Sequence, residues 1–247
     1  MPQATAVLPP EAAARRTSAR GFYTGMGVVA ILVVVAGFGS SYYGMATGTG
    51  TLTPLVKAHG LVFALWLVLF IVQTRLVATR RVAMHRRLGL AAVALAVAMV
   101  ALGYATAVAG ARRGFDLNFS GDPLGYMVFP LGGLVGFTVL VAAALWYRRR
   151  PDVHKRLMLL AIIGPLMNAP LAHFVANTAV LRGTLLPFLA MMITLLAASA
   201  VYDRVTSGRV HPISLWGAVL LFAWGNLQAV VIGPSAGWHR FAAWLIR

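Results

Sequence analysis

Two histidines within long apolar stretches are the side chains of this sequence best suited to chemistry. His59 lies sixteen residues before Arg75, and His173 lies sixteen residues after Leu157. If Arg75 and Leu157 lie on one side of a membrane, a helical rise of about 1.5 Å per residue places both imidazoles at one depth, roughly 24 Å across. Two imidazoles at one height on facing helices are the axial ligand pattern of haem b. We therefore expect His59 and His173 to form a metal-binding or haem-binding pair.

Aromatic and polar residues follow His59 at heptad spacing, which places them on one face of a helix. They are Phe63, Trp66, Phe70 and Gln73. This face should point toward protein, because burying an unpaired imidazole or amide in lipid is costly. We expect Trp66 to pack against the haem and Gln73 to provide a secondary polar contact.

A second histidine pair lies in an internal repeat. RRVAMHRRL at positions 80–88 matches RRPDVHKRL at 149–157, and His85 and His154 occupy the same place in the two copies. The cations beside them favour neutral imidazole, the form that binds ligands. The pair is a candidate second site for haem or quinone. The alternative is a pair of headgroup-facing residues in basic loops, whose likeness reflects convergence on the positive-inside pattern.

Amide side chains predict a polar cavity that opens to the extracytoplasmic side. Pro165 and Pro170 each free the carbonyl four residues back, and in a membrane such a carbonyl needs a partner or a cavity. We expect the cavity between the second, fifth and seventh spans, with Ser40 and Ser41 nearby. Its polar groups would be Asn168, Asn177, Asn226 and Gln228. The alternative is that these amides are interhelical hydrogen bonds, worth about 0.6 to 2 kcal/mol each.

Several chemistries lack their essential groups. The chain has no cysteine, which excludes disulfides, thiolate metal sites and cysteine nucleophiles. We expect all five acidic residues to lie in the N-terminal tail or in loops, which leaves no intramembrane carboxylate for a proton relay or a cation cage. They are Glu11, Asp116, Asp122, Asp152 and Asp203. Motifs of hydrolases, P-loop ATPases, zinc proteases and dinucleotide-binding enzymes are also missing.

The elements that must position these residues are transmembrane helices. Of the 247 residues, 60% are hydrophobic and 11% are charged, and the mean hydropathy is +0.82, values that lie outside the soluble range. We expect an all-α polytopic bundle of about seven helices, in which helices two and three repeat as four and five. The predicted spans are 22–40, 58–74, 88–110, 124–147, 157–178, 184–202 and 213–232. Around this domain (21–233) we expect a disordered cytoplasmic tail (1–20) and an interfacial C-terminal segment (234–247).

The basic residues predict orientation and surroundings. The net charge of +16 comes from 21 Lys and Arg residues, and most of them fall on the side of the N-terminal tail. The positive-inside rule therefore places the N-terminus in the cytoplasm and the C-terminus outside. Because the cations flank apolar runs, we expect anionic lipid headgroups as partners and no nucleic acid. The excess of Arg over Lys is typical of a GC-rich bacterium, which indicates the bacterial inner membrane.

The strings HGLVFALWLVLFIVQ, MHRRLG and HKRLM, in this order, resemble an uncharacterised family of bacterial multi-pass membrane proteins. The likeness covers the second to fifth spans and implies no particular activity. A fainter similarity to cytochrome b561-like proteins implies histidines at matched depths on neighbouring helices as haem ligands, which here concerns His59 and His173.

Three functions remain open from the sequence, and it does not decide whether the protein is an enzyme. The first is a redox or electron-transfer protein that holds haem b between His59 and His173. The second is a carrier or binding protein for a small polar or amphipathic molecule in the outer cavity. The third is a non-catalytic accessory or assembly subunit of a membrane complex. A membrane enzyme with a histidine-bound metal is disfavoured because second-shell carboxylates are lacking.

Overall fold

The computed structural model describes residues 10–48, 52–117 and 121–247, with the backbone alone for residues 10–20 and 45. The described chain is helical and contains seven helices long and apolar enough to cross a membrane. The protein is therefore an all-α, multi-pass transmembrane bundle, as the sequence predicts. Its elements are α1 (Pro10–Ala46), α2 (Pro54–Ala78), α3 (Val82–Arg112), α4 (Pro123–Tyr126), α5 (Val128–Trp146), α6 (Pro151–Ala161), η1 (Ile162–Leu166), α7 (Met167–Asn177), α8 (Leu186–Ser207), α9 (Pro212–Leu227), η2 (Gln228–Ile232) and α10 (Ala236–Leu245).

Three of the seven spans are composite. The fourth consists of α4 and α5, the fifth of α6, η1 and α7, and the seventh of α9 and η2. The elements η1 and η2 are single turns of π-helix. Such turns occur mostly inside α-helices, frequently at functional sites. The fifth and seventh spans are thus the irregular ones.

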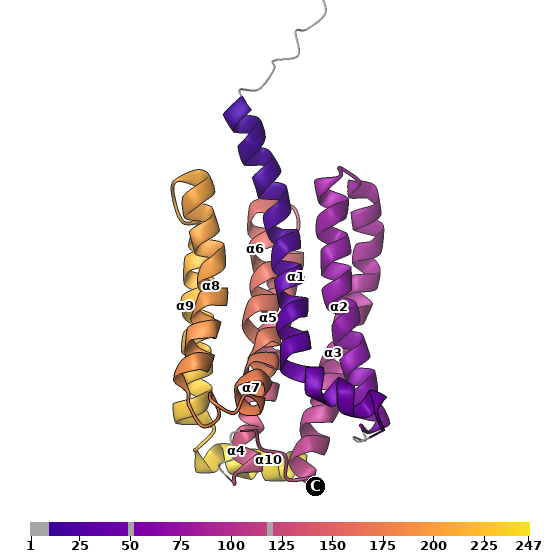
Figure 1. The fold of residues 1–247 in the computed structure, drawn as a ribbon, viewed down its shortest axis with the longest axis vertical. Helices are drawn as coiled ribbons and strands as arrows, with labels where there is room; N and C mark the ends of the chain where they lie inside the picture. The colour runs from indigo at the N-terminus through magenta and orange to yellow at the C-terminus, as the bar shows by residue number, and fades with distance from the viewer. Residues whose placement is uncertain (1–9, 49–51, 118–120) are drawn as a thin grey trace, which may run out of the picture.

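The bundle is built from helical hairpins (Figure 1). The neighbours α2 and α3, α5 and α6, and α8 and α9 pack against each other, and α1 packs against both α2 and α7. The short helix α10 lies across one end of the bundle and contacts α4. The first helix therefore lies beside both the second and the fifth spans.

The internal repeat has a structural counterpart. Helix α3 begins at Val82 and α6 begins at Pro151, which are equivalent positions in the two copies. In the first turns, His85 N donates to Arg81 O at 3.1 Å, and His154 N donates to Arg150 O at 2.9 Å. Each copy thus opens the second helix of a hairpin, with its histidine at the same point of the first turn.

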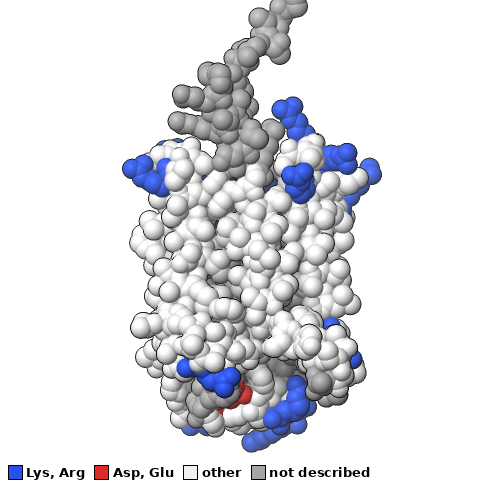
Figure 2. Space-filling view, in the orientation of Figure 1, with Lys and Arg blue, Asp and Glu red and all other residues white. Residues whose placement is uncertain are grey.

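Basic side chains mark both ends of the molecule. Figure 2 shows Lys and Arg gathered at the two ends of one face, with an uncharged band between them. We call the end formed by residues 79–81, 147–150 and 208–211 the arginine-rich end. The opposite end, where α10 lies, is the α10 end. An uncharged band between two charged rims is what a bilayer requires.

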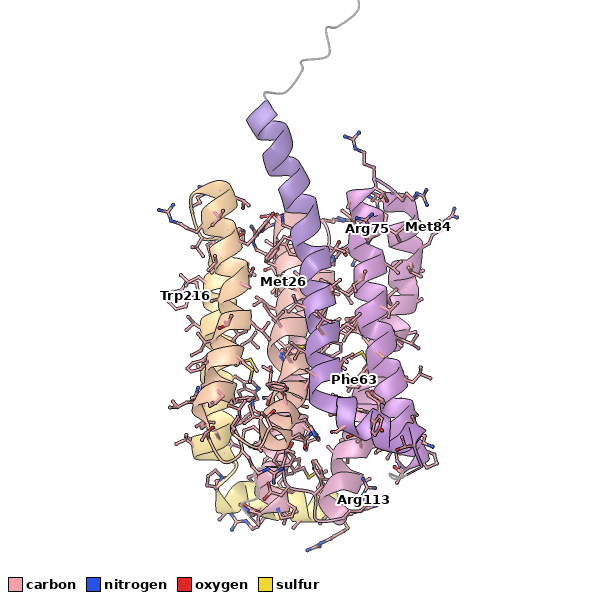
Figure 3. All side chains as sticks on the ribbon, in the orientation of Figure 1. Met26, Phe63, Arg75, Met84, Arg113 and Trp216 are labelled. Atoms are coloured by element: carbon pink, nitrogen blue, oxygen red, sulfur yellow. The ribbon has the colours of Figure 1, made fainter. Side chains whose placement is uncertain are left out.

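The core lies on the axis of the bundle, and large apolar side chains also face outward. Phe137, Met99 and Leu160 are fully buried, whereas Trp216 is 60% exposed and points away from the bundle (Figure 3). An outward-facing apolar surface of this kind is suited to lipid. The stripe that follows His59 faces protein as expected, because Trp66 and Phe70 are buried and Trp66 packs edge-on against Phe137.

The expected loop position of Asp203 is wrong. Asp203 lies in α8 and is fully buried, where it accepts hydrogen bonds from Arg156 of α6 and, at 2.6 Å, from Ser214 Oγ of α9. Asp152 likewise lies in the first turn of α6. The predicted sixth span ends one residue before Asp203, because the arginine that pairs with this carboxylate lies 47 positions earlier in the chain and no local pattern indicates it.

The predicted N-terminal tail falls partly outside the described residues. Residues 1–9 are not described, and residues 10–20 form helical backbone at the start of α1. A helix that leaves a membrane can continue because its hydrogen bonds are satisfied within the segment.

Candidate functional site

A cavity of about 590 Å³ lies in the half of the bundle nearer the α10 end. Its walls come from α4, α5, η1, α7, α8, α9 and η2, and from the loops around residues 183–185 and 233–234. The second span contributes no lining residue among those the structure describes, so the expected place between the second, fifth and seventh spans is corrected. The cavity lies instead between the fourth, fifth, sixth and seventh spans. Its size is within the range of small-molecule sites.

Apolar side chains dominate the wall. They include Phe129, Phe188, Met192, Leu196 and Phe222. Three of the four predicted amides join them, namely Asn168, Asn226 and Gln228. An apolar wall with a few fixed polar groups is the usual composition of a site for a small organic molecule.

The amides differ in their free hydrogen-bonding capacity. Asn226 Nδ2 donates to Phe222 O at 2.8 Å, and Gln228 Nε2 donates to Trp224 O at 3.2 Å. Asn168 has no hydrogen bond from its side chain within the described part of the chain, so its amide can serve a ligand. Asn177 lies outside this cavity and donates to Ser40 Oγ at 3.5 Å.

Both π-helical turns border the cavity. Gly164 and Pro165 of η1 line it, as do Gln228 and Ala229 of η2. Pro165 lies inside η1 and Pro170 inside α7, and because neither residue has an N–H, the fifth span lacks a backbone hydrogen bond at each of these positions. The expectation that these prolines adjoin a cavity is borne out for Pro165, which lines its wall.

Glycine allows the fourth and seventh spans to meet closely behind this wall. A Cβ atom on Gly132 would lie 2.2 Å from Gln228 Oε1, and Trp224 Nε1 donates to Gly132 O at 3.0 Å. Gln228 is 2% exposed, and its Oε1 has no hydrogen-bond partner within the described residues. The Gln228 amide, at the start of η2, is thus packed against the backbone of Gly132.

Helices α10 and α4 pack against each other at the α10 end, beside the cavity. His239 Nε2 lies 2.9 Å from Asp122 Oδ2, and Trp238 Nε1 donates to Leu124 O at 2.8 Å. Beyond α10, Arg112 Nε donates to Ile246 O at 2.8 Å, which ties the C-terminus to α3. Asp122 also lines the cavity, so α10 contacts the wall directly.

His239 and Asp122, the ionisable pair at the contact between α10 and α4, both have shifted pKa values. The Ser235 carbonyl and then Asp122 raise the pKa of His239 above its usual 6.5. Burial raises the pKa of Asp122, but hydrogen bonds from the Gly125 N–H and from His239 outweigh it and hold that pKa below 3.8. No local sequence pattern indicates this pair, because its members lie 117 positions apart.

The structure does not bring His59 and His173 together. His59 stacks on Phe63 of its own helix at a centroid distance of 4.1 Å, and His173 lies 4.6 Å from Phe38 of α1. No ring contact, hydrogen bond or ion pair joins the two imidazoles within the described residues. His173 lines a separate cleft at the α10 end with Ser40, Ser41 and Arg113.

The structure does place His85 and His154, the other predicted pair, next to each other. The ring centroids of His85 and His154 lie 6.4 Å apart. Gln73, expected beside the outer histidines, lies next to His85 instead. The structure therefore offers a cavity near the α10 end and an imidazole pair at the arginine-rich end.

No family model matches the chain, and neither a curated protein sequence nor a solved structure shows significant similarity to it. Functional inference therefore rests on the two sites themselves.

Proposed function

We propose that this protein binds or carries a neutral, lipid-like molecule with a hydrogen-bonding head in the cavity between α5, α7, α8 and α9. The observation that carries the proposal is the pairing of a largely apolar wall with the free amide of Asn168. An amide offers both a donor and an acceptor, so it suits a carbonyl, hydroxyl or amide head. The aromatic and aliphatic wall would enclose the apolar body.

The charge of the wall favours a neutral ligand. No Lys, Arg or His side chain lines the cavity within the described residues, and its one described acidic group, Asp122, contacts His239. A charged ligand would lose its hydration without gaining an opposite charge, which is strongly unfavourable in a low dielectric. We therefore expect a carboxylate analogue to bind more weakly than the matching alcohol or quinone.

The membrane orientation is part of the proposal. We place the arginine-rich end in the cytoplasm of a bacterial cell and the α10 end outside, as the positive-inside rule favours. Arginines of both rims would contact anionic lipid headgroups. The cavity would then be within reach of the outer leaflet and of the extracytoplasmic solution.

The haem hypothesis for His59 and His173 stays a prediction. Their separate neighbours give it no support, because axial ligation of one haem needs both rings on one iron. The accessory-subunit hypothesis likewise stays a prediction.

Ligand binding tests the proposal on purified full-length protein in lipid nanodiscs. The probes are a decyl-substituted benzoquinone, decanol and decanoic acid, and the signal is fluorescence quenching of Trp224, which lines the cavity. A Trp224→Phe variant identifies its share of the total emission. We expect saturable quenching by the quinone and displacement by decanol. Absence of saturable binding for both neutral probes would refute the proposal.

Two asparagines on one helix provide the matched variants. Asn168→Leu removes the free amide from the wall, whereas Asn177→Leu makes the same change outside the cavity. Loss of one hydrogen bond to a neutral head is worth about 0.5 to 1.5 kcal/mol. We expect Asn168→Leu to weaken quinone binding about 2- to 13-fold and Asn177→Leu to leave it unchanged. Equal effects of the two variants would contradict the assigned role of Asn168.

A further inference from the structure

The imidazole pair at the arginine-rich end is separate from the cavity. His85 lies in the first turn of α3 and His154 in the first turn of α6, and both are half-buried. Figure 3 labels Met84, the residue before His85, at this end of the molecule. Residues from four helices surround the pair, because Gln73 of α2 and Ala144 of α5 contact the two rings. The pair thus joins the two copies of the repeat.

Each ring is fixed by a contact to one nitrogen. His154 Nδ1 lies 2.8 Å from Ala144 O, so it carries the proton and donates it, and the lone pair of this ring is on Nε2. Metal-binding histidines characteristically donate their other N–H to a backbone carbonyl or carboxylate, which fixes tautomer and direction. His154 therefore has the arrangement of a ligand that binds through Nε2.

Gln73 contacts the same nitrogen of His85 in the opposite sense. With its amide nitrogen toward the ring, Gln73 donates to His85 Nδ1 at 2.6 Å and accepts from Gly89 N at 3.2 Å, so Nε2 of His85 carries the proton. A half-turn of the amide would present Oε1 to a protonated Nδ1 and leave the lone pair of His85 on Nε2. Metal binding at Nε2 therefore moves the ring proton of His85 to Nδ1, and Gln73 then gives up its contact with Gly89 N.

We propose that His85 and His154 bind a copper(I) ion through their Nε2 atoms. Two imidazoles on opposite sides of one ion, at metal–nitrogen distances of about 2.0 to 2.1 Å, have ring centroids roughly 6 Å apart. The observed separation is 6.4 Å. The interplanar angle of 81° is compatible with this arrangement, because each ring turns freely about a linear metal–nitrogen axis.

The ligand number selects copper(I). No group of three or more His, Cys, Asp or Glu side chains with metal-binding geometry occurs within the described residues. Zinc in proteins takes four ligands, three of them from protein even in catalytic sites. Copper(I) is satisfied by two nitrogen ligands in a line, and imidazole is a suitable donor for copper. Its single charge also costs less than a divalent charge beside Arg86 and Lys155.

Competition for copper(I) tests the site on full-length protein in detergent under anaerobic conditions. The protein is titrated into the coloured copper(I) complex of bicinchoninate, and loss of colour reports transfer of the ion. We expect one copper(I) per chain, and an X-ray absorption edge typical of two-coordinate copper(I). The same protein should show no comparable retention of zinc after dialysis.

Three variants and one control assign the ligands. His85→Asn and His154→Asn should each abolish the competition, and Gln73→Leu should weaken copper(I) binding about 10- to 100-fold. His211→Asn is the control at the same end, since His211 caps α9 by accepting from Ile213 N and Asn is a good capping residue. Thermal unfolding of each variant shows whether it is folded.

Three results would overturn the copper site. These are failure of the parent protein to compete for copper(I), unchanged binding in folded His85→Asn or His154→Asn, and a Soret absorption band that depends on both histidines, which would assign the pair to haem. Asn168→Leu should leave copper(I) binding unchanged, so a failure of the cavity proposal and a failure of this one are distinguishable.

Discussion

His239 of α10 lies with Nε2 2.9 Å from Oδ2 of Asp122, while its Nδ1 lies 2.9 Å from the carbonyl oxygen of Ser235. Both ring nitrogens thus face oxygen acceptors, and only the imidazolium ion can donate to both. Asp122 also caps the start of α4, where it accepts from Gly125 N at 2.8 Å. Protonation of one histidine is therefore linked to docking of α10 beside the cavity.

This linkage predicts that docking of α10 weakens as the pH rises. His239 stabilises the docked helix below its undocked pKa near 6.5, and this contribution is lost as the pH rises through the raised docked value. Asp122 contributes above 3.8 and loses its contribution as the pH falls through its lowered pKa. We expect α10 to dock most tightly between about pH 3.8 and 6.5, where both contributions are fully present.

Hydrogen exchange of residues 236–245, corrected for its intrinsic pH dependence, measures this effect. Protection should be greater at about pH 5.5 than at about pH 8.5. The pair is partly exposed, so the difference corresponds to no more than about 1 kcal/mol. His239→Gln should remove the pH dependence and Arg240→Gln should keep it. A pH-independent parent would contradict the linkage.

Asp203→Asn is expected to destabilise the bundle strongly. The substitution leaves the Arg156 guanidinium without its counter-charge where the two side chains are 9% and 1% exposed. Removal of one partner from a buried ion pair costs about 3 to 5 kcal/mol. The free energy of unfolding in mixed detergent micelles measures the loss.

Asp152→Asn is the control for the buried pair. Its side chain is largely exposed and contacts His211 at 3.4 Å, so the expected loss is about 0 to 1 kcal/mol. The double variant Arg156→Met with Asp203→Leu should recover part of the stability lost in Asp203→Asn, because it removes both charges. Similar losses for Asp203→Asn and Asp152→Asn would show that the buried pair is unimportant.

Gly37→Ala should separate α1 from α7. A Cβ atom at this position would lie 2.2 Å from the carbonyl oxygen of Pro170, and backbone cannot move aside as a side chain can. Overpacking of this kind costs about 1 to 3 kcal/mol. Gly39→Ala is the matched variant two residues on, where an added Cβ atom would meet no packing neighbour outside its own stretch of helix within 4 Å. We expect a lower melting temperature for Gly37→Ala alone, and equal melting temperatures would contradict the close contact.

Gly132→Ala should alter the cavity through Gln228. The added methyl group would overlap the Gln228 amide, which lines the wall at the start of η2. At Gly136 the same change meets atoms of Pro165 and Trp224 at ordinary contact distances of 3.8 to 4.0 Å. We expect Gly132→Ala to weaken quinone binding in the fluorescence assay severalfold, by an energy of about 1 kcal/mol. Gly136→Ala should bind as the parent does.

Single cysteines can establish the orientation, because the chain has none of its own. Arg209→Cys places a thiol at the arginine-rich end, and Val180→Cys places one in an exposed position at the α10 end. With the proposed orientation, a membrane-impermeant maleimide should label Val180→Cys in intact cells whose outer membrane has been removed. Arg209→Cys should react only after lysis. The reverse labelling pattern would invert the proposed orientation.

The sequence determined the elements and one of the two histidine pairs. Span length and hydropathy are local properties, so all seven membrane-spanning helices were predicted near their observed positions. The repeat aligns the starts of α3 and α6 and so indicates His85 and His154, whose ring centroids lie 6.4 Å apart in the structure. Prolines at 165 and 170 likewise indicated that the fifth span is irregular.

The tertiary structure alone decided which helices are neighbours. Equal depth on two helices does not make them adjacent, and α1 packs against both α2 and α7, which carry His59 and His173. The cavity walls, the Arg156–Asp203 pair and the His239–Asp122 contact all join residues distant in sequence. Membrane helices are apolar on lipid-facing and protein-facing sides alike, so hydropathy does not reveal partners. Small residues such as Gly37 and Gly132 select them by permitting close approach.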